Sequence, residues 1–262
     1  MKRSMASHSN AISSFPAAYR CFLQGFLLGL FLLTLAACGS EGDTMVDPAK
    51  PSQSTDPKVL IESAIKKQEV GAYQSAIEEL NRALQVDPKS VPAQFQIGEI
   101  YKEWGKRPEA MTAYKKVLAL KPDHIQAHLG LAWIYDKMSY NDQALLELLK
   151  VAKITPDDPE IHFKIALEHW YMQDLEACVD SYRKVIELSP RHLQAHLNLA
   201  SVYEKQKNWD RSLSEIGRSI QIGEETGETQ AVNIAKNKLK FLKGRMNISE
   251  EEFQRKSQPP FN

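Results

Sequence analysis

Apolar residues recur along the middle of the chain at the three-to-four-residue spacing of amphipathic helices. A representative stretch holds two such runs, Leu129, Leu131, Ala132, Ile134 and Tyr135, followed by Ala144, Leu145, Leu148 and Leu149. This spacing predicts two short helices, each with one apolar face. A pair of short helices cannot bury such faces alone, so the pattern predicts further helix pairs stacked on both sides.

The two-helix pattern returns at a fixed interval. The prolines Pro88, Pro122, Pro156 and Pro190 lie 34 residues apart, and small residues share the same interval at Ala76, Ala110, Ala144, Cys178 and Ser212. A period of this length indicates an array of similar units. Each proline ends a unit because proline cannot continue a helix interior. The small residues predict points where two helix backbones approach closely.

The repeat resembles the tetratricopeptide repeat. The second unit carries the family pattern as Ile97-Gly98, Tyr101, Ala110, Tyr114, Val117 and Pro122. The resemblance implies an all-α fold, a right-handed solenoid of about five 34-residue helix-turn-helix repeats over residues 58–226. The chain departs from the family where a large residue, usually Trp, is expected, because these positions hold Leu60, Gln94, His128, His162 and His196. Glu224 replaces the fifth proline, which indicates the end of the array.

A further helix is predicted after the repeats. Its apolar positions are Ala231, Ile234, Ala235, Leu239 and Leu242, with lysines on the other side. We interpret residues 227–246 as a capping helix that covers the last unit. Its basic face suits solvent, and contact with anionic lipid is the alternative. We expect residues 247–262 to form a flexible tail.

The N-terminus has the features of a secretory signal. Lys2, Arg3 and Arg20 precede an apolar run from Cys21 to Ala37, and no acidic residue occurs before Glu41. A charged segment, an apolar segment and small residues at the cleavage site define a signal peptide, here residues 1–37. The alternative is a transmembrane anchor, for which a 17-residue run is at the short limit. The true start could also be a later residue such as Met5.

The run ends in Leu35-Ala36-Ala37-Cys38, which resembles a bacterial lipobox. The resemblance implies cleavage before Cys38 and acylation of Cys38 with fatty acids such as palmitate, which would hold the protein to a membrane without spanning it. Gly39, in place of Asp, favours the outer membrane, facing the periplasm. Residues 38–57 are rich in Ser, Asp, Thr and Pro, so we expect a disordered lipidated tether.

Several kinds of chemistry find no support. The formal net charge is zero, which argues against a nucleic-acid partner. We find no phosphate-binding loop, nucleophile motif or CxxC, and therefore expect no catalytic residues, no cofactor and no small-molecule substrate.

His128, His162 and His196 recur one unit apart, too far to share a metal ion, so we expect them to pack between units. We expect Cys178 to be a small buried residue without a disulfide.

Binding is the remaining function. In tetratricopeptide proteins the first helices of successive units line a concave groove that holds a partner peptide or helix. The resemblance assigns the groove here to Phe95, Leu129, Trp133, Asp136, Glu160, Phe163, Trp170 and Tyr171. The aromatic residues among them suit binding hot spots. The family's Lys and Asn clamp for a C-terminal carboxylate is missing, because apolar residues occupy those positions.

Two functions fit these observations. The first is a lipid-anchored scaffold or adaptor of the bacterial cell envelope, which recruits protein partners for pilus, secretion or cell-wall assembly, as lipoproteins of this repeat family do. The second is a self-associating structural lipoprotein with no separate client.

Overall fold

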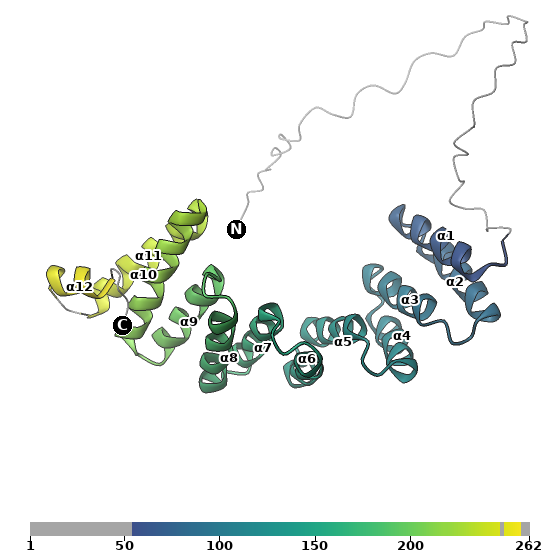
Figure 1. Ribbon diagram of the computed structural model, residues 1–262, viewed down its shortest axis with the longest axis horizontal. Coiled ribbons are helices and arrows are strands. Elements are labelled where there is room, and N and C mark those ends of the chain that lie inside the picture. Colours follow the sequence, from purple (N-terminus) through teal and green to yellow (C-terminus); the bar gives the residue numbers. More distant parts are fainter. Residues whose placement is uncertain (1–53, 247–248, 258–262) are drawn as a thin grey trace, which may run out of the picture. The chain divides into compact units, whose positions relative to one another are not determined.

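The repeat region is entirely helical. The computed structural model describes residues 54–246 and 249–257, and within them it contains twelve helices and no strand (Figure 1). The predicted signal peptide, Cys38 and all but the last residues of the predicted tether lie outside the described residues. None of the described helices combines the length and the apolar character needed to cross a membrane.

The first ten helices form five consecutive pairs. Their bounds are α1 (Pro57–Glu69) and α2 (Tyr73–Val86), α3 (Val91–Glu103) and α4 (Arg107–Leu120), α5 (Ile125–Lys137) and α6 (Asn141–Ile154), α7 (Pro159–Tyr171) and α8 (Leu175–Leu188), α9 (Leu193–Lys205) and α10 (Trp209–Thr226). The two helices of a pair pack on each other, and the second helix packs on the first helix of the next pair (Figure 1). The repeat solenoid predicted from the sequence is confirmed.

Local signals set where the helices begin and turn. Asp56 and Asp158 cap α1 and α7 through their side chains, and a proline occupies the first turn of each. Between the two helices of each unit, one residue adopts a positive φ, at Gly71, Gly105, Ser139, Gln173 and Lys207. This left-handed residue reverses the chain direction, so that the second helix packs back on the first.

The recurring small residues lie where helices meet. Ala110, Ala144 and Cys178 are fully buried, as predicted. The Cys178 thiol donates to the carbonyl oxygen of Ala166 at 3.3 Å, and the Ser212 hydroxyl makes the corresponding bond to Ala200 at 2.9 Å. Burial raises the pKa of Cys178 to about 12, with the charge of Asp174 as a smaller cause. The thiol is therefore a packing group, as the sequence indicates.

One tyrosine ring fills the space between two glycines. A Cβ atom on Gly98 would lie 2.7 Å from the Tyr114 ring, and one on Gly130 would lie 2.6 Å from it. Both distances are shorter than any normal carbon contact. The absence of a side chain at these two positions therefore allows α3 and α5 to close on a fully buried Tyr114.

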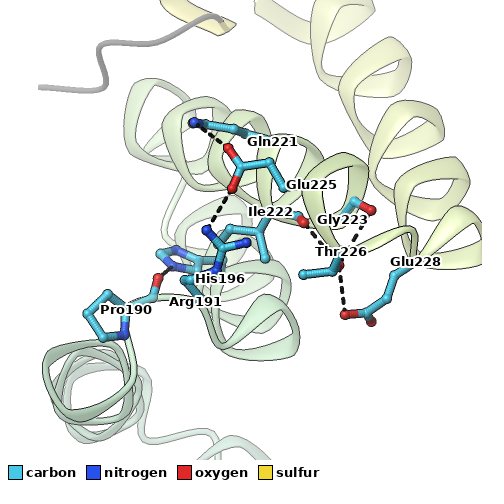
Figure 2. Close-up of polar contacts among 9 residues, drawn as sticks. All are labelled: Pro190, Arg191, His196, Gln221, Ile222, Gly223, Glu225, Thr226 and Glu228. Atoms are coloured by element: carbon cyan, nitrogen blue, oxygen red, sulfur yellow. Dashed lines mark hydrogen bonds and ion pairs between the residues drawn. The ribbon is translucent and has the colours of Figure 1, made fainter.

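The repeating histidines join successive units. The Nε2 atoms of His128, His162 and His196 lie 2.8–3.0 Å from the carbonyl oxygens of the prolines that end the preceding units. Figure 2 shows this contact for His196 and Pro190. His128 and His196 also bond to a glutamate through Nδ1. They pack between units, as predicted. Within the described ranges, no group of three or more His, Cys, Asp or Glu side chains is arranged to hold a metal ion.

The fifth unit carries an additional contact on its surface. Arg191, in the loop before α9, bonds to Glu225 near the end of α10 at 2.7 Å, and Gln221 bonds to the same carboxylate at 3.0 Å (Figure 2). These two bonds lower the pKa of Glu225, with that of Gln221 the larger cause. The contact ties the two ends of the fifth unit together.

Two helices follow the repeats. Helix α11 (Thr229–Met246) packs on α10 and buries Val232, Ala235 and Leu242, in agreement with the predicted capping helix. The tail predicted as flexible differs in its described part. Residues 250–257 form helix α12 (Glu250–Ser257), which also packs on α10. The physical reason is Phe253, whose buried ring joins the apolar cluster under α10 and α11.

Candidate functional site: a groove across three repeats

A groove opens along the first helices of the second, third and fourth units. It has a volume of about 550 Å³ and is lined by residues of α3, α5 and α7, with Leu148 of α6 at its base. This size lies within the range of ligand pockets, roughly 300–1,000 Å³. Because the first helices recur every 34 residues, equal positions on them align side by side and form one continuous surface.

Five of the eight residues assigned to a groove from the sequence line this one. They are Phe95 on α3, Leu129, Trp133 and Asp136 on α5, and Tyr171 on α7. The rings of Trp133 and Tyr171 are 40% and 54% exposed, large values for aromatic residues. The groove therefore combines an apolar floor with two aromatic rings that a partner could cover.

The other three assigned residues lie at the joint between the fourth and fifth units and do not line this groove. The Phe163 ring stacks on His192 with 5.0 Å between centroids, and Glu160 Oε1 lies 3.2 Å from His192 Nε2. Trp170 packs against the apolar cluster shared by α7, α8 and α9, and Lys205 lies over its ring at 4.1 Å. The aromatic residues assigned to the groove from the sequence are therefore divided between this groove and the joint.

The physical reason is that residues at the same position in different units have different neighbours. Phe163 has the same place in its unit as Phe95, and Phe95 likewise packs on a loop histidine, His124, at 5.0 Å. Phe95 also borders the groove, whereas Phe163 does not. The family offset identifies the helix face correctly, but the neighbouring unit decides whether that face is covered. Binding by any of the eight residues stays a prediction.

Most charged side chains in the groove are already paired. Lys102 bonds to Glu99, and Lys137 Nζ lies 3.1 Å from Asp136 Oδ2. Lys164 is exposed and takes part in none of the ion pairs of the described residues. These pairs on α3 and α5 leave one acidic side chain of the groove, on α7, outside any ion pair of the described residues.

That acidic side chain is Glu168, which sequence reasoning missed. It lines the groove, is only 5% exposed, and its Oε2 atom has no hydrogen-bond partner in the part of the chain that the structure describes. Burial and, as a smaller cause, the charge of Asp136 raise the pKa of Glu168 to about 7, while Lys137 opposes the shift. At neutral pH this carboxyl is therefore close to the midpoint of its titration.

A signal for Glu168 was present in the repeat itself. The corresponding residues of other units are Ile100, Ile134 and Val202, and all three are fully buried aliphatic side chains. The first unit has an exposed lysine, Lys66, at this position, so Glu168 departs from the buried aliphatic residue of the other three units. Comparison of all units at each position, rather than at the family's motif positions alone, would have found it.

A solenoid of helix pairs with an open groove on its first helices defines a class of protein that binds others through an extended surface. Models of the tetratricopeptide repeat match residues 103–166 and 163–225. With the fold described above, these matches show that residues 103–225 consist of tetratricopeptide repeats.

Solved structures of the same fold resemble the repeat region. A crystal structure of MamA protein has a TM-score of 0.60 at 19% identity and covers 66% of this chain and 94% of its own. MamA from Desulfovibrio magneticus RS-1 gives 0.59 at 18%, with 66% and 98% covered. YrrB, described as a tetratricopeptide protein with an unusual peptide-binding site, gives 0.58 at 20%, with 71% and 94% covered. Among curated protein sequences, none matches.

Proposed function

We propose that this protein is a lipid-anchored adaptor of the bacterial cell envelope, which binds a peptide or helix of another protein in the groove of α3, α5 and α7. The observation that carries the proposal is the pair of exposed rings, Trp133 and Tyr171, on either side of an apolar floor. Aromatic residues dominate binding energy because they combine a large apolar area with a polar tip. Peptide binding by a protein of the same fold, YrrB, is consistent with this use.

Site-specific photo-crosslinking in living cells tests the groove. A photoreactive amino acid replaces Trp133 in the full chain, and a control chain carries it in place of Leu146, an exposed residue of α6 outside the groove. We expect position 133 to crosslink to a different protein and position 146 not to do so. Crosslinks from position 146 alone would contradict the groove assignment. Crosslinks from position 133 to a second copy of this chain would favour the self-associating structural protein.

The anchor is a separate part of the proposal and concerns Cys38, which lies outside the described residues. Its support is the sequence Leu35-Ala36-Ala37-Cys38 after the apolar run. Two or more acyl chains hold a protein stably at a membrane, at about 0.8 kcal/mol for each buried methylene group. Replacement of Cys38 by Ala should abolish incorporation of labelled palmitate and release the protein from the membrane fraction. Unchanged labelling of the variant would refute this site.

The proposal includes neither catalysis nor a cofactor. The sequence offers no nucleophile or phosphate-binding motif, and apart from the exposed Lys164 the groove's charged residues are paired or, for Glu168, buried beside apolar residues. A binding surface needs shape and complementary chemistry, and both are available from the groove's residues.

A further inference from the structure

The chemistry of Glu168 identifies what the groove binds. Buried polar atoms in folded proteins nearly always have a hydrogen-bond partner. In the described ranges only two buried side-chain polar atoms lack one, Glu168 Oε2 and Nδ1 of the adjacent His169. An unpaired buried carboxylate destabilises a fold, and three of the other four units have a buried aliphatic residue at this position, Ile100, Ile134 and Val202.

The position of Glu168 places this unpaired carboxylate where it can recognise a binding partner. Glu168 lines an open groove and is 5% exposed, so the acceptor that the fold leaves unpaired lies just beneath the groove surface. An ionised carboxylate only accepts hydrogen bonds, and its strongest partners are cationic donors. Asp136 adds negative charge near Glu168, although Lys137 offsets part of it.

The surroundings of Glu168 match the shape of a long basic side chain. Lysine and arginine carry a charged head on an apolar stem. Leu129 and Leu167 line the same groove and can contact the stem, while the exposed face of Trp133 can contact the cation.

We propose that the groove recognises a partner segment through a lysine or arginine side chain whose charged head bonds to the buried carboxylate of Glu168. This inference rests on the proposed function, since it names the feature of the partner that the same groove selects. Glu168 is the specificity-determining residue, and the neighbouring aromatic rings contribute affinity.

Lys164 is the residue of this chain that could compete with a partner's cation for the Glu168 carboxylate. It lies four residues before Glu168 on α7 and has no ion-pair partner among the described residues. A lysine that precedes a glutamate by four residues is the less favourable order for such a pair, and Lys164 makes no bond to Glu168 in this structure. An external cation is therefore the better candidate for the unpaired oxygen.

Selection from a phage-displayed library of random short peptides tests the inference with the full chain as bait. Three baits run in parallel: the natural protein, Glu168→Gln, and Glu187→Gln, which removes an exposed carboxylate of α8 that pairs only with Lys184. A peptide counts as groove-bound when Trp133→Ala releases it. We expect groove-bound peptides from the natural protein and from Glu187→Gln to be enriched in Lys or Arg, and those from Glu168→Gln to lose this enrichment.

The selected basic peptides should bind Glu168→Gln roughly tenfold to a hundredfold more weakly than the natural protein, as expected for the loss of a charge-assisted bond. Glu168→Ile, which introduces the residue of the second and third units, should show the same loss while remaining folded. Groove-bound peptides with no basic preference, or with the same preference in Glu168→Gln, would overturn this inference and leave the proposed function intact. The absence of any groove-bound peptide would overturn both.

A further variant tests whether Lys164 competes with the peptide for Glu168. Lys164→Gln should leave the basic preference unchanged, because Lys164 does not pair with Glu168 in the structure. If Lys164→Gln strengthened the binding of basic peptides tenfold or more, Lys164 would be the resident partner of Glu168, and the carboxylate would not be free to select a ligand.

Discussion

Two tryptophans on neighbouring first helices have opposite roles. Trp133 of α5 is 40% exposed and lines the groove, whereas Trp170 of α7 packs into the joint with the fifth unit beneath Lys205. Both were assigned to one binding cluster from their positions on first helices. The difference shows that in a repeat array the neighbouring unit decides whether an aromatic ring stabilises the stack or remains available to a partner.

The largest expected effect is the difference between the losses of stability caused by Trp170→Ala and by Trp133→Ala. Trp170→Ala should lower the free energy of unfolding by about 2–4 kcal/mol, slightly below the range for fully buried aromatic residues. Trp133→Ala should change it by less than about 0.5 kcal/mol, as is usual at exposed positions. Chemical denaturation followed by circular dichroism gives both values. Equal losses in the two variants would show that Trp133 is also a packing residue.

The next effect concerns the helices that frame the groove. Gly130→Ala places a methyl group against the Tyr114 ring, where a Cβ atom would lie at 2.6 Å. Overpacking of this kind destabilises a protein by typically 1–3 kcal/mol. The matched control is Gly244→Ala in α11, where a Cβ atom would meet nothing within 4 Å.

The control should stabilise the protein by about 0.5–1 kcal/mol, because alanine favours a helix more than glycine does. Thermal unfolding of the two variants should therefore shift in opposite directions. Stabilisation by Gly130→Ala would mean that α3 and α5 do not close on Tyr114.

A smaller effect, of opposite sign, should come from Glu168. Glu168→Ile should raise the free energy of unfolding by roughly 1–3 kcal/mol, because it removes a buried polar group without a partner and restores the residue type of three other units. The melting temperature should rise by about 2–4 °C per kcal/mol for a chain of this size. A lower melting temperature would show that the carboxylate supports the fold.

A further effect is the pH dependence of that gain. The folded pKa of Glu168, about 7, lies above its ordinary value of 4.5. Between these values the folded state holds a proton that the unfolded state has released, so stability decreases as pH rises through this window. The groups that act on Glu168 from α5 are Asp136 and Lys137, and Lys164 and Tyr171 share its helix and the groove.

The difference in melting temperature between Glu168→Gln and the natural protein should therefore be small at pH 4.5 and increase up to about pH 8. A difference that does not change with pH would mean that burial does not raise the pKa of Glu168.

The fold could be predicted because it depends on spacing. Stacked helix pairs are predicted by the 34-residue interval, by the small residues and by the apolar stripes. The structure buries the small residues Ala110, Ala144 and Cys178, as this prediction requires. Helix α12 was missed because one buried side chain, Phe253, holds it, and a single aromatic residue produces no period.

The groove could be predicted only in part. Its helix face follows from the repeat, which correctly placed Trp133 and Tyr171. The covering of Phe163 and Trp170 depends on His192 and Lys205, which no motif position specifies. Glu168 could have been found in the sequence, because only an irregularity among equivalent positions reveals it.

Fluorine NMR of the tryptophans tests the central claim most directly. The chain has four tryptophans, Trp104, Trp133, Trp170 and Trp209, so labelling with 5-fluorotryptophan gives four signals that single Trp→Phe variants assign. The probe is a lysine-containing peptide from the phage selection, added to the full chain. We predict that the Trp133 signal shifts with saturation and that the Trp170 and Trp209 signals stay in place. A shift at Trp170 or Trp209 with no change at Trp133 would contradict the account, because binding would then occur outside the groove.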